Sequence, residues 1–222
     1  AQEVPTFYIA KTETTWGMWQ TVRTWAVAHG YDLSGVGTGN GDSYPVTSVS
    51  WYQSVKWCNA RSEMEGLTPV YRVNGTIYRS GNSAPEVNAS ADGYRLPGEA
   101  EWEFAARGGI RTHNYYYSGS DDINAVGWYY YNSYYRVIQT VGQKAGNELG
   151  LYDMSGNVSE WCFDRNTSSS SSYYWYDYRT FRGGSVNYDG YYCSIMNRQF
   201  YDGPSRTDYY IGFRVARSSV PQ

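Results

Sequence analysis

Residues 150–161 read GLYDMSGNVSEW, a stretch that combines a glycine turn with two carboxylates seven residues apart, Asp153 and Glu160. Such a turn can direct two carboxylate oxygens and the backbone carbonyls between them onto one hard cation, which is the coordination that Ca²⁺ prefers. The same spacing suits a buried turn in which both carboxylates accept hydrogen bonds from backbone amides. Spacing alone favours the buried turn and leaves calcium as the alternative. Residues 161–162, which follow, are expected in the core.

Two segments upstream of this turn carry helical patterns. Between residues 15 and 29, tryptophans and other apolar residues recur every three or four positions, and Gly30 follows as a stop signal. The second segment begins with a capping-box pattern at Ser50 and Gln53 and runs toward Gly66. Both are amphipathic, so each needs a sheet or a partner helix to cover its apolar face.

A third, shorter helix is expected within residues 96–106. Pro97 suits the first helical position because a backbone amide there has no hydrogen-bond partner within the helix, so its absence costs nothing. The glutamates at 99, 101 and 103 suit the positive end of the helix dipole. The glycines at 108 and 109 then end the helix.

The rest of the chain alternates short extended pieces with long aperiodic stretches. Strands are clearest at residues 71–73, 76–78 and 211–216. Residues 35–41 and 167–172 are expected to form surface loops. The first of these contains a run of alternating glycines, but it lacks the preceding strand, the following helix and the lysine of a phosphate-binding loop.

Length and charge limit the class of protein. With 222 residues the chain is expected to form a single domain over residues 1–222, large enough for a real core. Eighteen basic and 21 acidic residues give a net charge of −3, with no Lys/Arg cluster, so nucleic-acid binding is not expected. No apolar run is long enough to span a bilayer. The chain begins Ala-Gln-Glu without a signal-peptide core, as expected of a mature or trimmed chain, so export is not judged from it.

Tyrosine is the unusual component, at 26 residues beside 9 Trp and 6 Phe. Tyrosine offers a large rigid contact area with a hydroxyl, which is why binding surfaces favour it, although a Tyr-rich core gives the same composition. The three cysteines, Cys58, Cys162 and Cys193, leave at least one free thiol and form no CxxC motif. Only two histidines are present, which argues against a His-rich metal site or a Ser-His-Asp triad.

Six ordered blocks together resemble the formylglycine-generating-enzyme, or sulfatase-modifying-factor, family. The blocks are residues 12–19, 45–51, 94–103, 150–161, 182–185 and 212–214. The match extends from Phe7 to Arg217, nearly the whole chain. It implies a C-type-lectin-like α+β fold with two main helices, a twisted, mainly antiparallel sheet and much irregular loop.

The resemblance also implies a structural calcium site in the glycine turn. Asp153 and Glu160 would give side-chain oxygens, and Gly156 and Val158 would give carbonyls. Ca²⁺ is therefore an expected, though not required, cofactor. Within the blocks, Ser159 stands where the family usually has Trp.

The activity of the enzymes does not carry over from the resemblance. Formylglycine-generating enzymes hold copper with two cysteines, five residues apart, shortly after the Gly-Gly-Ser block. Those positions here are Tyr188 and Cys193, so a two-thiolate copper site cannot form and neither copper nor catalysis is expected. The rival hypothesis is a copper oxidase that acts on a peptide cysteine through Cys193. Related iron enzymes need a His-rich triad that the chain lacks.

Residues 186–210 look like interchangeable residues set in a fixed frame, whose members are residues 182–185, Cys193, Arg198, Pro204, Arg206 and residues 211–214. This layout resembles the variable proteins of diversity-generating retroelements, in which adenine replacement yields residues such as Tyr, Asp, Ser and Thr but not Trp, Glu, Lys or Gln. Trp, Glu and Lys are absent between 186 and 210, whereas Met196 and Gln199 do not fit the pattern and are expected to be frame residues. The expected ligand-binding residues are Tyr188, Asp189, Tyr191, Tyr192, Phe200, Tyr201, Asp202, Ser205, Thr207, Asp208, Tyr209 and Tyr210.

Three functions are thus compared. The first is a non-enzymatic binding module that presents residues 186–210 to a variable macromolecular target, with display at the cell surface or outside the cell as the expected location. The second is the copper oxidase. The third is a structural cell-envelope domain with a Tyr-rich core, which predicts low tyrosine exposure. The aromatic tracts at 128–135 and 173–178 either flank the binding surface or cover the sheet.

Overall fold

The computed structural model describes residues 4–165, 177–198 and 201–219, and the structural statements below concern these residues. The helices are α1 (Trp16–Ala28), α2 (Trp51–Met64), α3 (Glu99–Ala106) and α4 (Ile123–Val126), with 3₁₀ turns η1 (Gly109–Arg111) and η2 (Gly190–Cys193). The strands are β1 (Phe7–Ile9), β2 (Tyr71–Val73), β3 (Thr76–Ile77), β4 (Glu86–Val87), β5 (Tyr94–Arg95), β6 (Ser159–Arg165), β7 (Arg179–Arg182), β8 (Tyr201–Asp202), β9 (Ile211–Gly212) and β10 (Ala216–Ser218).

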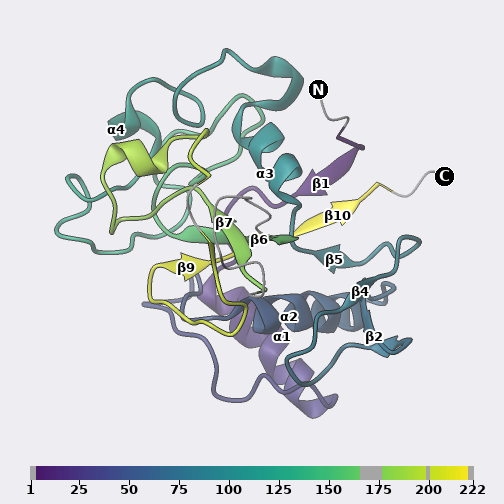
Figure 1. The fold of residues 1–222 in the computed structure, drawn as a ribbon. Helices are drawn as coiled ribbons and strands as arrows, with labels where there is room; N and C mark the ends of the chain where they lie inside the picture. The colour runs from purple at the N-terminus through teal and green to yellow at the C-terminus, as the bar shows by residue number, and fades with distance from the viewer. Residues whose placement is uncertain (1–3, 166–176, 199–200, 220–222) are drawn as a thin grey trace.

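The strands form three small sheets. Their strand orders are β1-β10-β5, β3-β2-β4 and β8-β7-β6-β9, and the pairs are antiparallel except for β6 with β9. Helices α1 and α2 lie side by side at one end of the molecule, and the opposite end consists mostly of loops around α3 and α4 (Figure 1). This arrangement confirms the predicted α+β fold with two main helices and a mainly antiparallel sheet.

The helix boundaries follow local capping chemistry. The Ser50 hydroxyl accepts a hydrogen bond from the Gln53 amide while the Gln53 side chain accepts one from the Ser50 amide, which is the predicted capping box. The prediction for α3 was wrong in one detail. The first helical residue is Glu99, not the predicted Pro97, and Gly98 is the N-cap, whose amide donates a hydrogen bond to the Glu101 side chain.

The predicted strand at 211–216 is two strands that belong to different sheets. Residues 211–212 pair with β6, whereas β10 begins at Ala216 and pairs with β1 and β5. The loop at residues 35–41 is on the surface as expected, but it is fitted closely to α1. A Cβ at Gly39 would lie 2.4 Å from the Trp16 ring, so only glycine allows this approach. The predicted loop at 167–172 lies outside the described residues.

Tryptophans supply the largest fully buried side chains of the core, which also contains Tyr31, Tyr52, Tyr71 and Tyr78. The rings of Trp19 and Trp57 stack between α1 and α2, and Phe213 meets both edge-on. Buried indole N–H groups find backbone acceptors, as in the hydrogen bonds from Trp51 to the Cys162 carbonyl and from Trp161 to that of Val49. Several tyrosines are instead well exposed, which argues against a Tyr-rich core.

Two further expectations concern membranes and cysteines. Within the described ranges, no helix combines the length and the hydrophobicity needed to cross a bilayer. The three cysteines are free thiols and all are buried.

Candidate functional site

The backbone that frames residues 186–210 is buried and tied to the core. The Arg182 side chain is fully buried and donates to Glu99, Glu103 and the Ile195 carbonyl. Ser185 and Cys193 are also fully buried. The start of the candidate surface is therefore fixed to α3 by charge-assisted hydrogen bonds.

The end of the candidate surface is anchored in the same way. Arg214 is fully buried and forms a two-point ion pair with Glu160, with N–O distances of 2.6 and 2.7 Å. It also donates to the carbonyls of Ala10 and Tyr152. This one side chain joins the last strands to β6, to the N-terminal segment and to the glycine turn.

The predicted ligand-binding residues lie at the surface of this frame. None of the eleven that the structure describes is in the buried class. The exposed ones are Asp189, Tyr191, Tyr201, Ser205, Thr207 and Tyr209, and the half-buried ones are Tyr188, Tyr192, Asp202, Asp208 and Tyr210. Phe200 lies outside the described residues. The sequence therefore alternates a buried frame with accessible side chains through this region.

Ring contacts hold the exposed tyrosines in defined positions. Tyr192 lies next to both Tyr188 and Tyr191, with centroid distances of 5.7 and 5.3 Å, and Tyr209 meets Tyr210 edge-on at 5.2 Å. Such pairs favour fixed offset or edge-to-face geometries. The rings therefore form a surface with limited freedom, which suits binding because less side-chain entropy is lost on contact.

A small hollow of about 70 Å³ lies among these residues, and we call it the central hollow. It is lined by Ser159, Phe181, Asn187, Tyr188, Asp202, Arg206, Asp208, Tyr210 and Ile211. Arg206 forms ion pairs with both aspartates, at 3.0 and 3.4 Å. At the same hollow, the fully buried Ser159 hydroxyl has no hydrogen-bond partner among the described residues.

The central hollow thus combines aromatic walls, two carboxylates, one guanidinium and a free hydroxyl. Burial raises the pKa of the Tyr188 phenol, and the Asp208 carboxylate raises it further, so this phenol stays protonated and able to donate. Arg206 was expected to belong to the fixed frame, but it is exposed and lines the hollow with the predicted contact residues.

Neighbouring loops extend the surface in ways that the sequence left open. The Tyr130 amide donates to the Tyr188 carbonyl at 2.9 Å, which joins the tract at 128–135 to the predicted site. From the other side, the Asn40 amide group donates to the Tyr209 hydroxyl at 3.1 Å. In the tract at 173–178, residues 173–176 lie outside the described residues. No local pattern marks Asn40, since its role depends on the fold.

A second hollow, of about 310 Å³, adjoins Tyr191, and we call it the side hollow. It is lined by Tyr116, Tyr191, Ser194, Met196, Asn197 and Arg198. Arg198 was expected in the fixed frame, yet it is exposed and pairs with Glu103 on α3. Met196 was likewise expected to be a frame residue, but it is exposed and lines this hollow together with Tyr191.

The glycine turn has a structural arrangement of its own. Asp153 accepts a hydrogen bond from the Gly142 amide at 2.7 Å, as the buried-turn alternative expected. Both oxygens of Glu160 are occupied by Arg214 and by the Trp102 indole. The carbonyls of Gly156 and Val158 belong to the same turn.

The predicted ligand set therefore does not fit a calcium ion as it stands, because a cation at Glu160 would have to displace Arg214. Within the described ranges, no group of three or more His, Cys, Asp or Glu side chains could hold a metal ion. Ca²⁺ at this turn remains a prediction.

The cysteine of the predicted enzyme-like pair is poorly placed for reaction. Cys193 is fully buried, and burial raises the pKa of its thiol to about 12. The thiolate is the nucleophile and the metal ligand, so burial and the raised pKa both disfavour reaction at Cys193 near neutral pH. Tyr188, at the other position, supplies no sulfur.

Comparison with known proteins agrees with this architecture. The family model of the sulfatase-modifying factor enzyme 1-like domain matches residues 1–219. The chain belongs to this family. The Chaperone protein LppX of Paenibacillus barcinonensis is 37% identical to this chain over 182 residues, which cover 71% of this chain and 62% of LppX. The chain thus spans less than two thirds of that relative.

Solved structures show the fold of the family. The crystal structure of CarF is 31% identical with a TM-score of 0.88, and the match covers 99% of this chain and 88% of CarF. Treponema denticola variable protein 1 is 30% identical with a TM-score of 0.76, over 96% of this chain and 84% of that protein. The chain therefore has the C-type-lectin-like fold that the resemblance implied.

Proposed function

We propose that this chain is a non-enzymatic binding protein that presents residues 186–210 to a macromolecular target and varies them to change that target. The observation that carries the proposal is the division between frame and surface. Residues 182–186, 193 and 211–214 are buried, whereas every described residue of the predicted contact set is at least partly exposed. Such a surface can change its side chains without changing its core.

Chemistry supports binding over catalysis. The central hollow offers hydrogen-bonding groups and rings, but Tyr188 stands at the first position of the copper-binding cysteine pair that the family resemblance implies, and Cys193, at the second position, is buried. Similarity to a protein named variable protein 1 over 96% of the chain supports the diversified surface. Display at the cell surface, where a varied binder meets new partners, is part of the proposal.

A library experiment tests the proposal. Codons for Tyr191, Tyr201, Ser205, Thr207 and Tyr209 would be randomised together and the library displayed on yeast. We expect most variants to be displayed at wild-type levels, because these side chains are exposed. Sorting against lysozyme, used as an arbitrary protein target, should then yield binders.

A matched control library would randomise Arg182, Ser185, Cys193, Phe213 and Arg214, all fully buried. Display of this library should collapse. If the surface library collapsed as well, the five exposed side chains would be structural and the proposal would fail. If the surface library were displayed but no binders to lysozyme emerged, the proposed binding role would fail while the division into frame and surface survived.

A further inference from the structure

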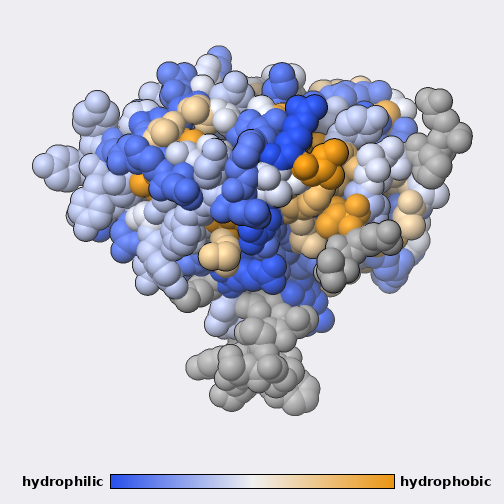
Figure 2. Space-filling view, turned by 90° about the horizontal axis from the view of Figure 1, so that it is seen from above, coloured by the Kyte–Doolittle hydropathy of each residue, from blue (hydrophilic) through white to orange (hydrophobic). Residues whose placement is uncertain are grey.

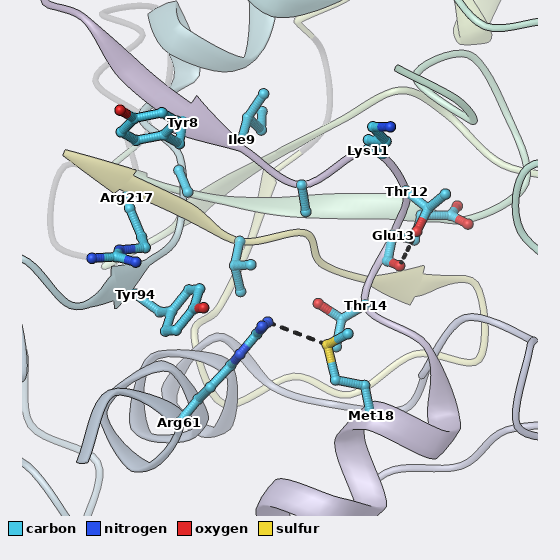
Figure 3. A pocket seen from close by; sticks show the side chains of 13 residues that line it. Tyr8, Ile9, Lys11, Thr12, Glu13, Thr14, Met18, Arg61, Tyr94 and Arg217 are labelled. Atoms are coloured by element: carbon cyan, nitrogen blue, oxygen red, sulfur yellow. Dashed lines mark hydrogen bonds between the residues drawn. The ribbon is translucent and has the colours of Figure 1, made fainter. Parts of the chain in front are cut away.

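A groove of about 580 Å³ lies away from residues 186–210, between the β1-β10-β5 sheet and the helices α1 and α2 (Figure 3). It is lined by Tyr8, Ile9, Ala10, Lys11, Thr12, Glu13, Thr14, Met18, Arg61, Tyr94, Val215, Ala216 and Arg217. We call it the sheet groove. Its volume lies within the range of about 300–1,000 Å³ that is typical of ligand sites. None of its lining residues belongs to the candidate binding surface.

Strand register places aromatic and cationic side chains in a row along this groove. Tyr8 of β1 pairs with Arg217 of β10, and Arg217 pairs with Tyr94 of β5, so the three share one face of the sheet. Arg61 of α2 continues the row, since its guanidinium stacks on the Tyr94 ring at 3.9 Å. Figure 3 shows the four side chains along one side of the groove. Tyr8 is 68% exposed, although nothing in the sheet requires a large ring there.

Several polar groups in the groove have no partner within the described chain. The Thr14 hydroxyl is buried and unpaired, and it points toward the open middle of the groove (Figure 3). The Lys11 side chain is exposed, and no hydrogen bond or ion pair holds its ammonium group. Arg217 uses only its Nε, which donates to the Asp92 carbonyl, so both terminal nitrogens are free. The groove therefore keeps donors available.

The acidic groups near the groove are already engaged. Glu65 accepts from Arg61 Nε at 2.8 Å and from the Tyr94 hydroxyl at 2.6 Å, which shows how this row receives a carboxylate. Asp92 accepts from the Thr68 amide at the rim. Glu13 lines one end, but its oxygens accept from Val158 and Asn157 in the core. The groove is thus lined by three cationic side chains, those of Lys11, Arg61 and Arg217. Of the three carboxylates, those of Glu65 and Asp92 lie outside the lining, and that of Glu13 is turned into the core.

From this geometry we infer that the sheet groove binds an acidic peptide segment of a partner protein, with alternating carboxylate and apolar side chains. Arg217, Arg61 and Lys11 would pair with the carboxylates, and the Thr14 hydroxyl would bond to a peptide carbonyl or carboxylate. Ala10, Val215 and Ala216 provide apolar floor for the other side chains. An extended peptide can follow a concave groove between a sheet and two helices and reach its floor, whereas a flat bilayer surface meets mainly the rim, so the groove favours the peptide. The inference does not depend on the proposed function of residues 186–210.

Fluorescence anisotropy with a defined probe tests this inference. The probe is a fluorescein-labelled peptide of sequence Glu-Leu-Glu-Tyr-Glu-Leu-Glu-Tyr, and its control has Lys in place of Glu. We expect the acidic peptide to bind at least about tenfold more tightly than the lysine peptide, and to lose affinity as salt is raised from about 20 to about 150 mM.

Variants locate the site. Arg217→Gln and Lys11→Gln should each weaken binding about three- to tenfold, and the double variant should weaken it further. Lys11→Gln breaks no internal bond, so loss of folding cannot explain its effect. The matched control is Arg111→Gln, which removes the same charge from an exposed position outside the groove. It should leave affinity unchanged, as should Tyr191→Ala, which lies outside the groove on the candidate binding surface.

Three results would overturn the inference. The first is the absence of binding at millimolar peptide, and the second is equal affinity for the acidic and the lysine peptide. The third is that Arg111→Gln weakens binding as much as Arg217→Gln or Lys11→Gln does, which would show general charge attraction. Stronger binding to phosphatidylglycerol vesicles than to the peptide, dependent on Arg217, would assign the groove to lipid instead.

Discussion

Replacing Asp153 by asparagine should stabilise the protein at neutral pH by up to about 3 kcal/mol. Asp153 is 2% exposed, only one of its oxygens accepts a hydrogen bond, and the other has no partner among the described residues. Burial, which outweighs the Gly142 amide and the Arg214 charge, raises the pKa of Asp153 to about 6, and the Glu160 charge adds to the rise. Its φ is +60°, a conformation that asparagine also tolerates.

The pH dependence follows from this raised pKa. In the unfolded chain the carboxyl loses its proton near its ordinary value of 3.8, whereas in the folded protein it keeps the proton up to about 6. The contribution of protonated Asp153 to the free energy of unfolding is therefore fully present below pH 3.8. It decreases as the pH rises from 3.8 to about 6, and it is absent above about pH 6. The difference of about two pH units is worth about 3 kcal/mol, at about 1.4 kcal/mol per unit. Asparagine cannot ionise, so it avoids this loss.

Urea unfolding of both proteins at pH 4, 5, 6, 7 and 8, followed by tryptophan fluorescence, measures the effect. Asp153→Asn should match the wild type at pH 4 and exceed it increasingly up to pH 7. Burial raises the pKa of Glu13 as well, and the Asp153 charge raises it further, so Asp153→Asn should also ease the ionisation of Glu13 and add to the stabilisation at neutral pH. The control Asp42→Asn, at an exposed position, should show no such trend. A variant less stable than wild type at pH 7, together with calcium stabilising only the wild type, would refute the reasoning and support the calcium site.

The remaining predictions concern the anchor, the surface and the thiols. Arg214→Met should cost about 3–5 kcal/mol in urea unfolding because it leaves the buried charge of Glu160 unpaired, and adding Glu160→Gln should recover part of that loss; additive losses would show that the two side chains are not coupled. Tyr191→Ala should change the free energy of unfolding by less than about 0.5 kcal/mol because the ring is 57% exposed, whereas Tyr71→Ala should cost about 3–5 kcal/mol; similar losses would place Tyr191 in the core. Cys193 and the other two thiols should not react with Ellman's reagent in the native state and all three should react in urea; rapid native reaction of one thiol would show that burial does not protect it.

Local signals in the sequence predicted the parts of the fold that local physics decides. The capping box at Ser50 and the apolar spacing of residues 15–29 specify α1 and α2, because caps and helical periodicity involve near neighbours. The strand at 211–216 was divided wrongly, because an apolar run does not reveal where a strand changes its partner. Gly39 was read as loop flexibility, although its role depends on a distant ring, that of Trp16.

Some features of the candidate site could likewise be predicted from the sequence, and others depend on the fold. The alternation of frame and contact residues in 186–210 is a sequence property, and their exposure in the structure is consistent with it. The pairing of Glu160 with Arg214 could not be predicted, since 54 residues separate them and Glu160 offered a plausible cation ligand. The free Thr14 hydroxyl, likewise, becomes visible only when three strands and two helices surround it.

The most direct test of the central claim is to sequence the 3′ end of this gene from many isolates and clonal descendants. The account predicts substitutions concentrated at the exposed codons between 186 and 210, at adenines of a template copy, while codons 182–185, 193 and 211–214 stay fixed. Codons 186–210 as invariant as those of α1 and α2, or substitutions spread equally over the buried frame, would contradict it.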